Sequence, residues 1–351
     1  MPVKEKVARL VMENGSAFEG RAFGSMNTSQ GEVVFTTGMT GYQETLTDPS
    51  FAGQIVCMTY PLIGNYGLNL DDMESAAPRL RGFIVREKCD DPCNWRCEMN
   101  LDGFLRQHGI CGIEGIDTRA LTKLIRRSGT MLGAIVIGND DAPALAHSPN
   151  LVAGVSCKEP YSIGSASAKY HLAIMDFGVK TSILRELSDN DCKLSVFPAH
   201  SSLNEICSCE PDAVFLTNGP GDPKDLPDVI ETVKALIARK PVFGICLGHQ
   251  LISLACGCDT AKLKFGHHGG NHPVKDLRTG QVCITSQNHN YVVSNLSENI
   301  AITHVNVNDG TIEGVRHTSK PVMSVQFHPE ASPGPVDARY LFKEFLGLIK
   351  N

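Results

Sequence analysis

The sequence lacks the features that mark membrane, secreted and nucleic-acid-binding proteins. No apolar run is long enough to span a bilayer. Residues 1–6 contain no apolar signal core and include an acidic side chain, so they do not resemble a targeting peptide. A formal net charge of −6, without any basic stretch, argues against nucleic acid as a partner. We therefore expect a soluble cytoplasmic protein that binds neither nucleic acid nor membrane.

Motifs for metals and nucleotides are also missing. The 13 cysteines show no paired Cys/His set at zinc spacing, although Cys89, Cys93 and Cys97 recur at a regular interval. His267 and His268, together with His272, offer metal ligands, but the Gly-rich loop around them favours a structural or interface role. No Gly-x-x-x-x-Gly-Lys-[Ser/Thr] loop is present. We expect no metal and no cofactor in this chain, and an intracellular setting that keeps the thiols reduced.

The chain of 351 residues is long enough for two domains. Residues 1–150 are rich in glycine and β-formers and predict a smaller α+β or mainly β domain. Residues 151–170 are small and polar, which indicates a linker. From residue 171 to 351, strands alternate with helices, which predicts an α/β domain with a mainly parallel sheet. Functional loops would then lie at the carboxyl ends of its strands.

A nucleophile elbow is predicted at Cys246. An apolar strand runs into Gly244-Ile245-Cys246-Leu247-Gly248, and a helical segment follows. This is the Gly-x-nucleophile-x-Gly pattern, with cysteine in the place of serine. The flanking glycines remove Cβ atoms that would collide in so tight a turn. The start of a helix also favours a thiolate. The alternative is a buried core thiol without chemistry.

A cysteine nucleophile needs a base and a group that orients the base. His328 and Glu330 follow the last predicted strand, and in extended geometry their side chains point the same way. Glu330 can then hold the imidazole while His328 faces Cys246. An ordinary surface turn is the alternative for this pair.

Acyl chemistry also requires donors for an oxyanion. The backbone N–H of Leu247 follows the nucleophile directly, and a second donor is expected from the loop that contains Gly219 and Gly221. This loop also fits an ordinary turn. Gln250 lies one helical turn after Cys246, where it faces a polar substrate or simply solvent.

Taken together, these motifs resemble the class I (triad) glutamine amidotransferases. The resemblance rests on residues 218–222, 244–250 and 328–330 and covers 171–351. The whole chain, including its N-terminal part, resembles the glutaminase subunits of carbamoyl-phosphate synthases. The segments that carry this second resemblance are 35–44, 47–50, 60–67, 115–122, 265–273 and 328–335.

The resemblance implies a role for each matching residue. Cys246 is the nucleophile, His328 the base and Glu330 its partner. The implied contacts to glutamine are Ser50, Gly219, Gly221, Leu247, Gln250, Asn288, Asn290 and Tyr291. Asn290-Tyr291 stands where family members often have Gly-Phe; backbone contacts would survive this change, and Asn tolerates a left-handed backbone. We expect Lys180 to line the site entrance.

The resemblance also implies partners. A large subunit would receive the ammonia and would hold ATP and Mg²⁺, and such heterodimers can assemble further. Two alternatives stay open at this point. The chain would serve another synthase, such as one for anthranilate or guanylate, or it would be an inactive regulatory subunit. The roughly 150-residue N-terminal domain opposes the first alternative, and the intact Cys246, His328 and Glu330 oppose the second.

Overall fold

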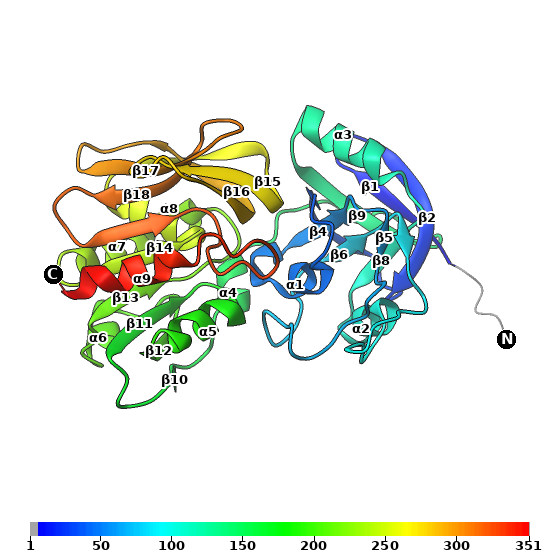
Figure 1. Cartoon of the computed structure of the whole chain (residues 1–351). Helices are drawn as coiled ribbons and strands as arrows, with labels where there is room; N and C mark the ends of the chain where they lie inside the picture. Colours follow the sequence, from blue (N-terminus) through cyan, green and yellow to red (C-terminus); the bar gives the residue numbers. More distant parts are fainter. Residues whose placement is uncertain (1–5, 351) are drawn as a thin grey trace. The chain divides into compact units, whose positions relative to one another are not determined.

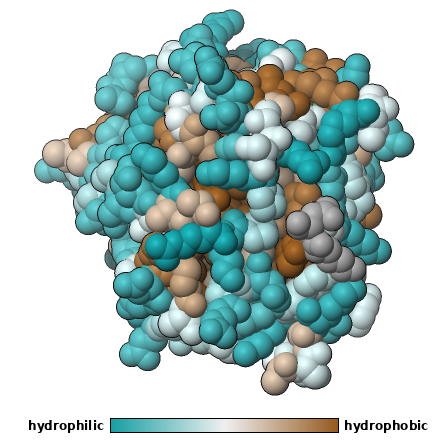
Figure 2. Space-filling model, turned by 90° about the vertical axis from the view of Figure 1, so that its left-hand side faces the viewer, coloured by the Kyte–Doolittle hydropathy of each residue, from teal (hydrophilic) through white to brown (hydrophobic). Residues whose placement is uncertain are grey.

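The computed structural model describes residues 6–350, and the chain divides into two compact units (Figure 1). Unit 1 comprises the chain up to Pro149 together with Lys264–His268. Unit 2 comprises Asn150–Leu263 together with the chain from Gly269 onward. Within residues 6–350, no helix combines the length and the apolar character that a membrane crossing requires. Figure 2 shows a face on which hydrophilic residues predominate and apolar side chains gather in patches.

Unit 1 is built around a closed β-barrel with the strand order β1-β2-β8-β6-β4-β3-β9. The first hairpin forms at Asn14-Gly15, where Val11 pairs with Ala17 and Gly15 has a φ of 83°. This positive φ is the reason that Asn-Gly predicts the turn. The barrel strands are β1 Val7–Met12, β2 Ala17–Gly24, β3 Ser29–Thr36, β4 Gln54–Met58, β6 Gly82–Ile84, β8 Cys111–Glu114 and β9 Met131–Ile137.

Short helices surround this barrel, in agreement with a mainly β prediction. In α3, the Asp117 side chain accepts the Ala120 N–H at 2.9 Å and caps the helix, as its sequence predicts. A separate pair of short parallel strands completes the unit. The remaining elements are α1 Tyr42–Thr47, η1 Pro49–Phe51, β5 Leu62–Ile63, β7 Glu87–Lys88, α2 Leu101–Gln107 and α3 Thr118–Ser128.

Unit 2 contains a ten-stranded sheet with the order β10-β12-β11-β13-β14-β19-β18-β16-β15-β17. The central strands β12, β11, β13, β14 and β19 are parallel. The flanking pairs β10–β12, β18–β19, β16–β18 and β15–β17 are antiparallel. The sheet is therefore mixed, whereas the sequence predicts a mainly parallel one. Its strands are β10 Tyr161–Ile163, β11 Tyr170–Asp176, β12 Cys192–Pro198, β13 Ala213–Leu216, β14 Val242–Ile245, β15 Asp259–Asp276, β16 Val282–Asn295, β17 Ile300–Asn306, β18 Ile312–His317 and β19 Val322–Val325.

Helices cover both faces of the parallel strands. Along β11, Leu172 and Ile174 pack in the cluster that contains α5 and α9, whereas Ala173 and Met175 pack in the cluster that contains α6, α7 and α8. This alternation follows from the two-residue period of a strand. The helices are α4 Leu151–Val155, α5 Thr181–Asp189, α6 Leu203–Cys207, η2 Pro223–Asp225, α7 Pro227–Ile237, α8 Leu247–Ala255, α9 Tyr340–Gly347 and η3 Leu348–Lys350.

The segment 151–170, which the sequence predicts to be a linker, contributes structure to unit 2. It contains α4, whose Val152 is buried among the α6–α8 residues, and β10, which pairs with β12. A short edge strand with exposed side chains has little apolar periodicity, so composition alone resembles that of a linker.

Candidate active site

Cys246 stands at a sharp turn between strand β14 and helix α8. Its backbone has a φ of 54° and a ψ of −106°, a conformation that a side chain with a Cβ rarely adopts. The Cys246 N–H donates to the carbonyl of Val325 at 2.9 Å, which fixes the turn against β19. The predicted strand–turn–helix context of an elbow is confirmed. Strain of this kind is typical of functional turns.

Both elbow glycines are needed for close packing. A Cβ on Gly248 would lie 2.3 Å from the carbonyl oxygen of Leu216, on the neighbouring strand β13. A Cβ on Gly244 would lie 2.7 Å from the carbonyl carbon of Gly248. The start of α8 therefore sits directly on the backbone of the sheet, and its N–H groups face the turn at Cys246.

His328 and Glu330 form a buried pair just beyond β19. The His328 Nδ1 donates to Glu330 Oε1 at 2.6 Å, and the side chains are 3% and 0% exposed. Burial by itself would lower the pKa of His328, but the Glu330 carboxylate and the Cys246 thiol raise it above its usual value. The imidazole is thus held in a defined tautomer beside Cys246 and retains a proton readily.

Lys180 completes this pair from the start of α5. Its Nζ donates to Glu330 Oε1 at 2.9 Å and to the Ala331 carbonyl at 2.8 Å. Burial raises the pKa of Glu330, but Lys180 and then His328 outweigh it, so the pKa lies below its usual value. The expectation that Lys180 lines the entrance is wrong, because its side chain is 3% exposed and bound to Glu330.

The strand β16 passes beside the elbow and brings three predicted residues to it. The Sγ of Cys246 lies 3.5 Å from the carbonyl oxygen of Asn288. The Gln250 Nε2 donates to the Tyr291 carbonyl at 2.8 Å and to Gln326 Oε1 at 3.0 Å. Gln250 is therefore bound within the protein, at 2% exposure, and holds α8 to β16. Gln326 lies two residues before His328, and the sequence does not predict its contact with Gln250.

Asn290 also lies in β16 and is not among the described residues with positive φ. The left-handed backbone that a glycine at this position would suggest is absent here. Extended backbone accepts any residue, so asparagine in place of the family's glycine needs no special conformation.

The loop of Gly219 and Gly221 lies against the first residue of α8. A Cβ on Gly219 would lie 2.4 Å from the Phe177 carbonyl oxygen and 2.8 Å from the Leu247 side chain. Gly221 has a φ of 93°. The loop thus approaches the elbow closely, as the sequence predicts for a second source of backbone donors.

Ser50 belongs to unit 1. It lies in η1, is 6% exposed, and its N–H donates to Asp48 Oδ1 at 2.8 Å. Its contact with glutamine stays a prediction. The other predicted site residues all belong to unit 2.

The comparisons with known proteins match both halves of the chain. The family model "Carbamoyl-phosphate synthase small chain, CPSase domain" matches residues 10–135. The model "Glutamine amidotransferase class-I" matches residues 173–348. These two matches cover most of the barrel, apart from the outer ends of β1 and β9, and the mixed sheet with its elbow, apart from β10 and the start of β11.

Curated relatives span nearly the full length of the chain. The carbamoyl phosphate synthase small chain of Clostridium perfringens is 54% identical over 97% of this chain and 98% of its own. The small chain of Bacillus caldolyticus is 52% identical over 98% and 96%, respectively. The "pyrimidine-specific small chain" of Bacillus subtilis is 50% identical over 98% and 96%.

Proposed function

This chain belongs to the family of carbamoyl phosphate synthase small chains, and from that premise we propose how its residues act. The chain is the glutaminase subunit of carbamoyl-phosphate synthase. It hydrolyses L-glutamine to glutamate and ammonia and passes the ammonia to the large subunit. The match of residues 10–135 distinguishes it from glutaminase chains of other synthases.

The elbow geometry of Cys246 next to the buried His328–Glu330 pair carries this proposal. The Glu330 carboxylate outweighs the effect of burial and raises the pKa of His328, so His328 accepts the proton of the Cys246 thiol and leaves the sulfur as a thiolate. The thiolate attacks the side-chain amide carbon of glutamine. His328 then gives its proton to the leaving nitrogen, so that ammonia departs and a γ-glutamyl thioester remains on Sγ.

Water completes the cycle. His328, now neutral, takes a proton from the water that attacks the thioester carbonyl, and glutamate leaves with Sγ restored as thiolate. The oxyanion of both tetrahedral steps is stabilised by the N–H of Leu247 and by a donor from the Gly219–Gly221 loop. Glu330 keeps the imidazole oriented, and Lys180 keeps Glu330 ionised.

Glutamine itself would be held by Ser50, Gln250, Asn288, Asn290 and Tyr291 in addition to the elbow and its loop. Two contacts support this assignment: Cys246 Sγ lies against the Asn288 carbonyl, and Gln250 donates to the Tyr291 carbonyl, so that β16 and α8 both lie beside the nucleophile. No cofactor is required for this chemistry. We assign ATP and Mg²⁺ to the large subunit, and we assign the chain to the cytoplasm, where its free cysteines stay reduced. The carbamoyl phosphate would serve pyrimidine and arginine synthesis.

The test uses the assembled two-chain enzyme. Cys246→Ser should abolish glutamate release and glutamine-dependent carbamoyl phosphate synthesis, while synthesis from added ammonia continues. Cys93→Ser is the matched control, since Cys93 is exposed in unit 1. Glutamate release by Cys246→Ser at the wild-type rate would refute the mechanism.

A further inference from the structure

The antiparallel end of the unit 2 sheet has one packed face and one exposed apolar face. We call this part the wing; it consists of residues 273–284, which are the end of β15, a connecting turn and the start of β16, and of residues 300–307, which are β17 and the residue after it. In the β15–β17 pairing, Val274 lies opposite Asn306, Lys275 opposite Val305 and Asp276 opposite His304. Residues that are directly opposite share a face, and successive residues alternate between faces.

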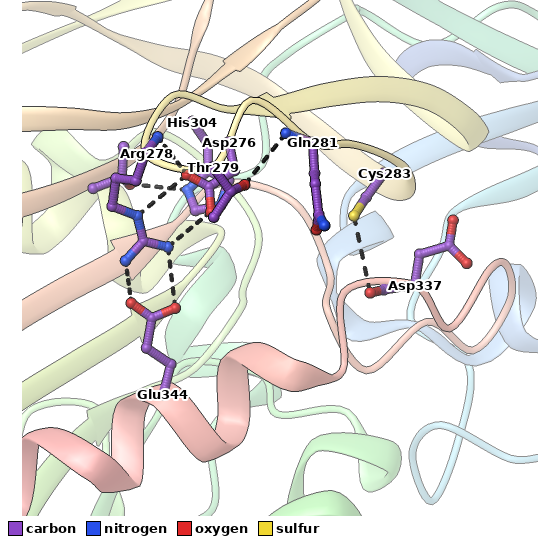
Figure 3. Close-up of polar contacts among 9 residues, drawn as sticks. Asp276, Arg278, Thr279, Gln281, Cys283, His304, Asp337 and Glu344 are labelled. Carbon is purple, nitrogen blue, oxygen red and sulfur yellow. Dashed lines mark hydrogen bonds and ion pairs between the residues drawn. The ribbon is translucent and has the colours of Figure 1, made fainter.

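The inner face of the wing packs on helix α9. Arg278 donates to Asp276 Oδ2 at 3.0 Å and to Glu344 Oε2 at 3.1 Å, as Figure 3 shows. On β16, the Cys283 Sγ contacts the Asp337 carbonyl at 3.9 Å, in the segment that leads into α9. The inner residues Val274, Asp276, His304 and Asn306 are at most 4% exposed. This face is therefore closed.

The outer face carries apolar side chains in contact with solvent. Lys275 and Val305 mark this face on β15 and β17. Alternation with the inner Cys283 puts Val282 and Ile284 of β16 on this face, and Leu277 and Val307 follow the last residues of β15 and β17. These four large apolar residues are 39–53% exposed. A solvated face of an antiparallel sheet is normally polar. A cluster of exposed aliphatic side chains on such a face marks an interaction surface.

We propose that the outer face of the wing is a docking surface for the large subunit of carbamoyl-phosphate synthase. The proposal rests on the proposed function, because that function requires a partner that receives ammonia. Ammonia is protonated in neutral water and then no longer acts as a nucleophile, so the acceptor chain must bind close to the site of release. The wing lies close to the site of release, because its strand β16 continues to the active site.

Strand β16 connects the outer face to the active site without a break. Ile284 is followed four residues later by Asn288, whose carbonyl lies 3.5 Å from the Cys246 Sγ. At about 3.3 Å per residue, the two positions are about 13 Å apart. Between them, the Ser286 carbonyl accepts the His328 N–H at 2.9 Å. A chain docked on Val282 and Ile284 therefore binds the strand that touches both the nucleophile and the base.

This continuity favours the large subunit over a second copy of the chain. A second copy has no use for ammonia, and nothing in the chemistry would place it beside the glutaminase site. Burial of aliphatic side chains at the centre of an interface contributes strongly to affinity. A lysine placed there would have to be buried without a partner charge.

The experiment measures binding of the two purified chains without glutamine. The double variant Val282→Lys, Ile284→Lys is compared with wild type by surface plasmon resonance, in the native chain and in the Cys246→Ser background. We expect the Kd to rise at least about tenfold. Leu296→Lys is the matched control, because Leu296 is 37% exposed just beyond the other end of β16. It should leave the Kd unchanged.

Two further measurements make the result decisive. Glutamate release by the isolated double variant should equal that of wild type, which shows that its fold is intact. An unchanged Kd, or an equal rise for Leu296→Lys, overturns the proposal. So does an isolated chain that sediments as a dimer and becomes a monomer on the double substitution, because the face would then belong to a second copy. Binding is read without catalysis, so loss of the proposed mechanism would not alter it.

Discussion

Replacing Lys180 by methionine tests the buried charge network of the site. The Lys180 Nζ lies 2.9 Å from Glu330 Oε1, and the two side chains are 3% and 0% exposed. Methionine keeps most of the volume and removes the charge. The Glu330 carboxylate would then remain buried with His328 as its partner and without the ammonium group. We expect this to destabilise unit 2 and to disturb the orientation of His328.

The magnitude follows from the loss of one partner of a buried ion pair. Such changes cost about 3–5 kcal/mol of unfolding free energy, because an uncompensated charge is left behind. Glu330→Gln in the Lys180→Met background removes this charge as well. The double variant should therefore regain a large part of the loss, so that the two effects are far from additive. It would still lack the group that raises the pKa of His328.

The network also predicts how stability depends on pH. The pKa of Glu330 is lowered in the folded state, so its contribution is present above the ordinary Glu pKa of about 4.3 and is lost as the pH falls through the folded value. Lys180 is the main group that lowers this pKa, so Lys180→Met should weaken the acid-side decline. The pKa of His328 is raised, so its contribution is present below about 6.5 and is lost as the pH rises towards its folded value.

Urea unfolding followed by circular dichroism, with thermal melts from pH 2 to 10, measures these effects, because the range has to extend well below the ordinary Glu pKa and well above the ordinary His pKa. A loss of 3–5 kcal/mol should lower the Tm by roughly 6–20 °C for a domain of this size. Lys343→Met is the control, because Lys343 is exposed on α9. The reasoning is refuted if Lys180→Met is no more destabilising than Lys343→Met, or if Glu330→Gln restores nothing.

Three further substitutions test the elbow, with a control in α4, and the prediction for unit 1. Gly248→Ala should destabilise the chain by about 1–3 kcal/mol or more, because its Cβ would lie 2.3 Å from the Leu216 carbonyl oxygen. Gly154→Ala, in α4 with no atom within 4 Å of its Cβ, should be neutral or stabilising by up to about 1 kcal/mol in urea unfolding. Ser50→Ala should raise the KM for glutamine about fivefold, in keeping with one lost hydrogen bond, and leave ammonia-dependent synthesis unchanged. An unchanged KM would contradict the predicted contact.

The parts of the fold that depend on neighbouring residues could be predicted from the sequence. The β1–β2 turn at Asn14-Gly15, the Asp117 cap of α3 and the elbow at Cys246 all follow from short-range sterics and hydrogen bonding. The spacing of His328 and Glu330 likewise predicts a pair, and the structure shows their hydrogen bond. The expected extended segment is wrong, because Pro329 and Glu330 lie in a turn that the Ala331 N–H closes onto the His328 carbonyl.

The parts that depend on distant residues could not be predicted in this way. Barrel closure and the antiparallel direction of β15–β18 depend on which strands pair, and an apolar run does not encode its partner. The role of Lys180 depends on Glu330, 150 residues further along the chain. The exposed outer face of the wing could not be predicted either, because Val282 and Ile284 have the sequence pattern of core residues. Only the strand register shows which side of the sheet is covered.

The active-site residues come from separate segments of the chain, and this determines how activity is lost on unfolding. Lys180, Cys246, Asn288 and His328 come from four segments that are joined only through the unit 2 sheet and the hydrogen bonds around it. Such a site has no partly assembled form, because no single hairpin or helix carries both the thiol and its base. Heat or denaturant should therefore remove glutaminase activity in the same cooperative step that melts the sheet, without a preceding inactive folded state.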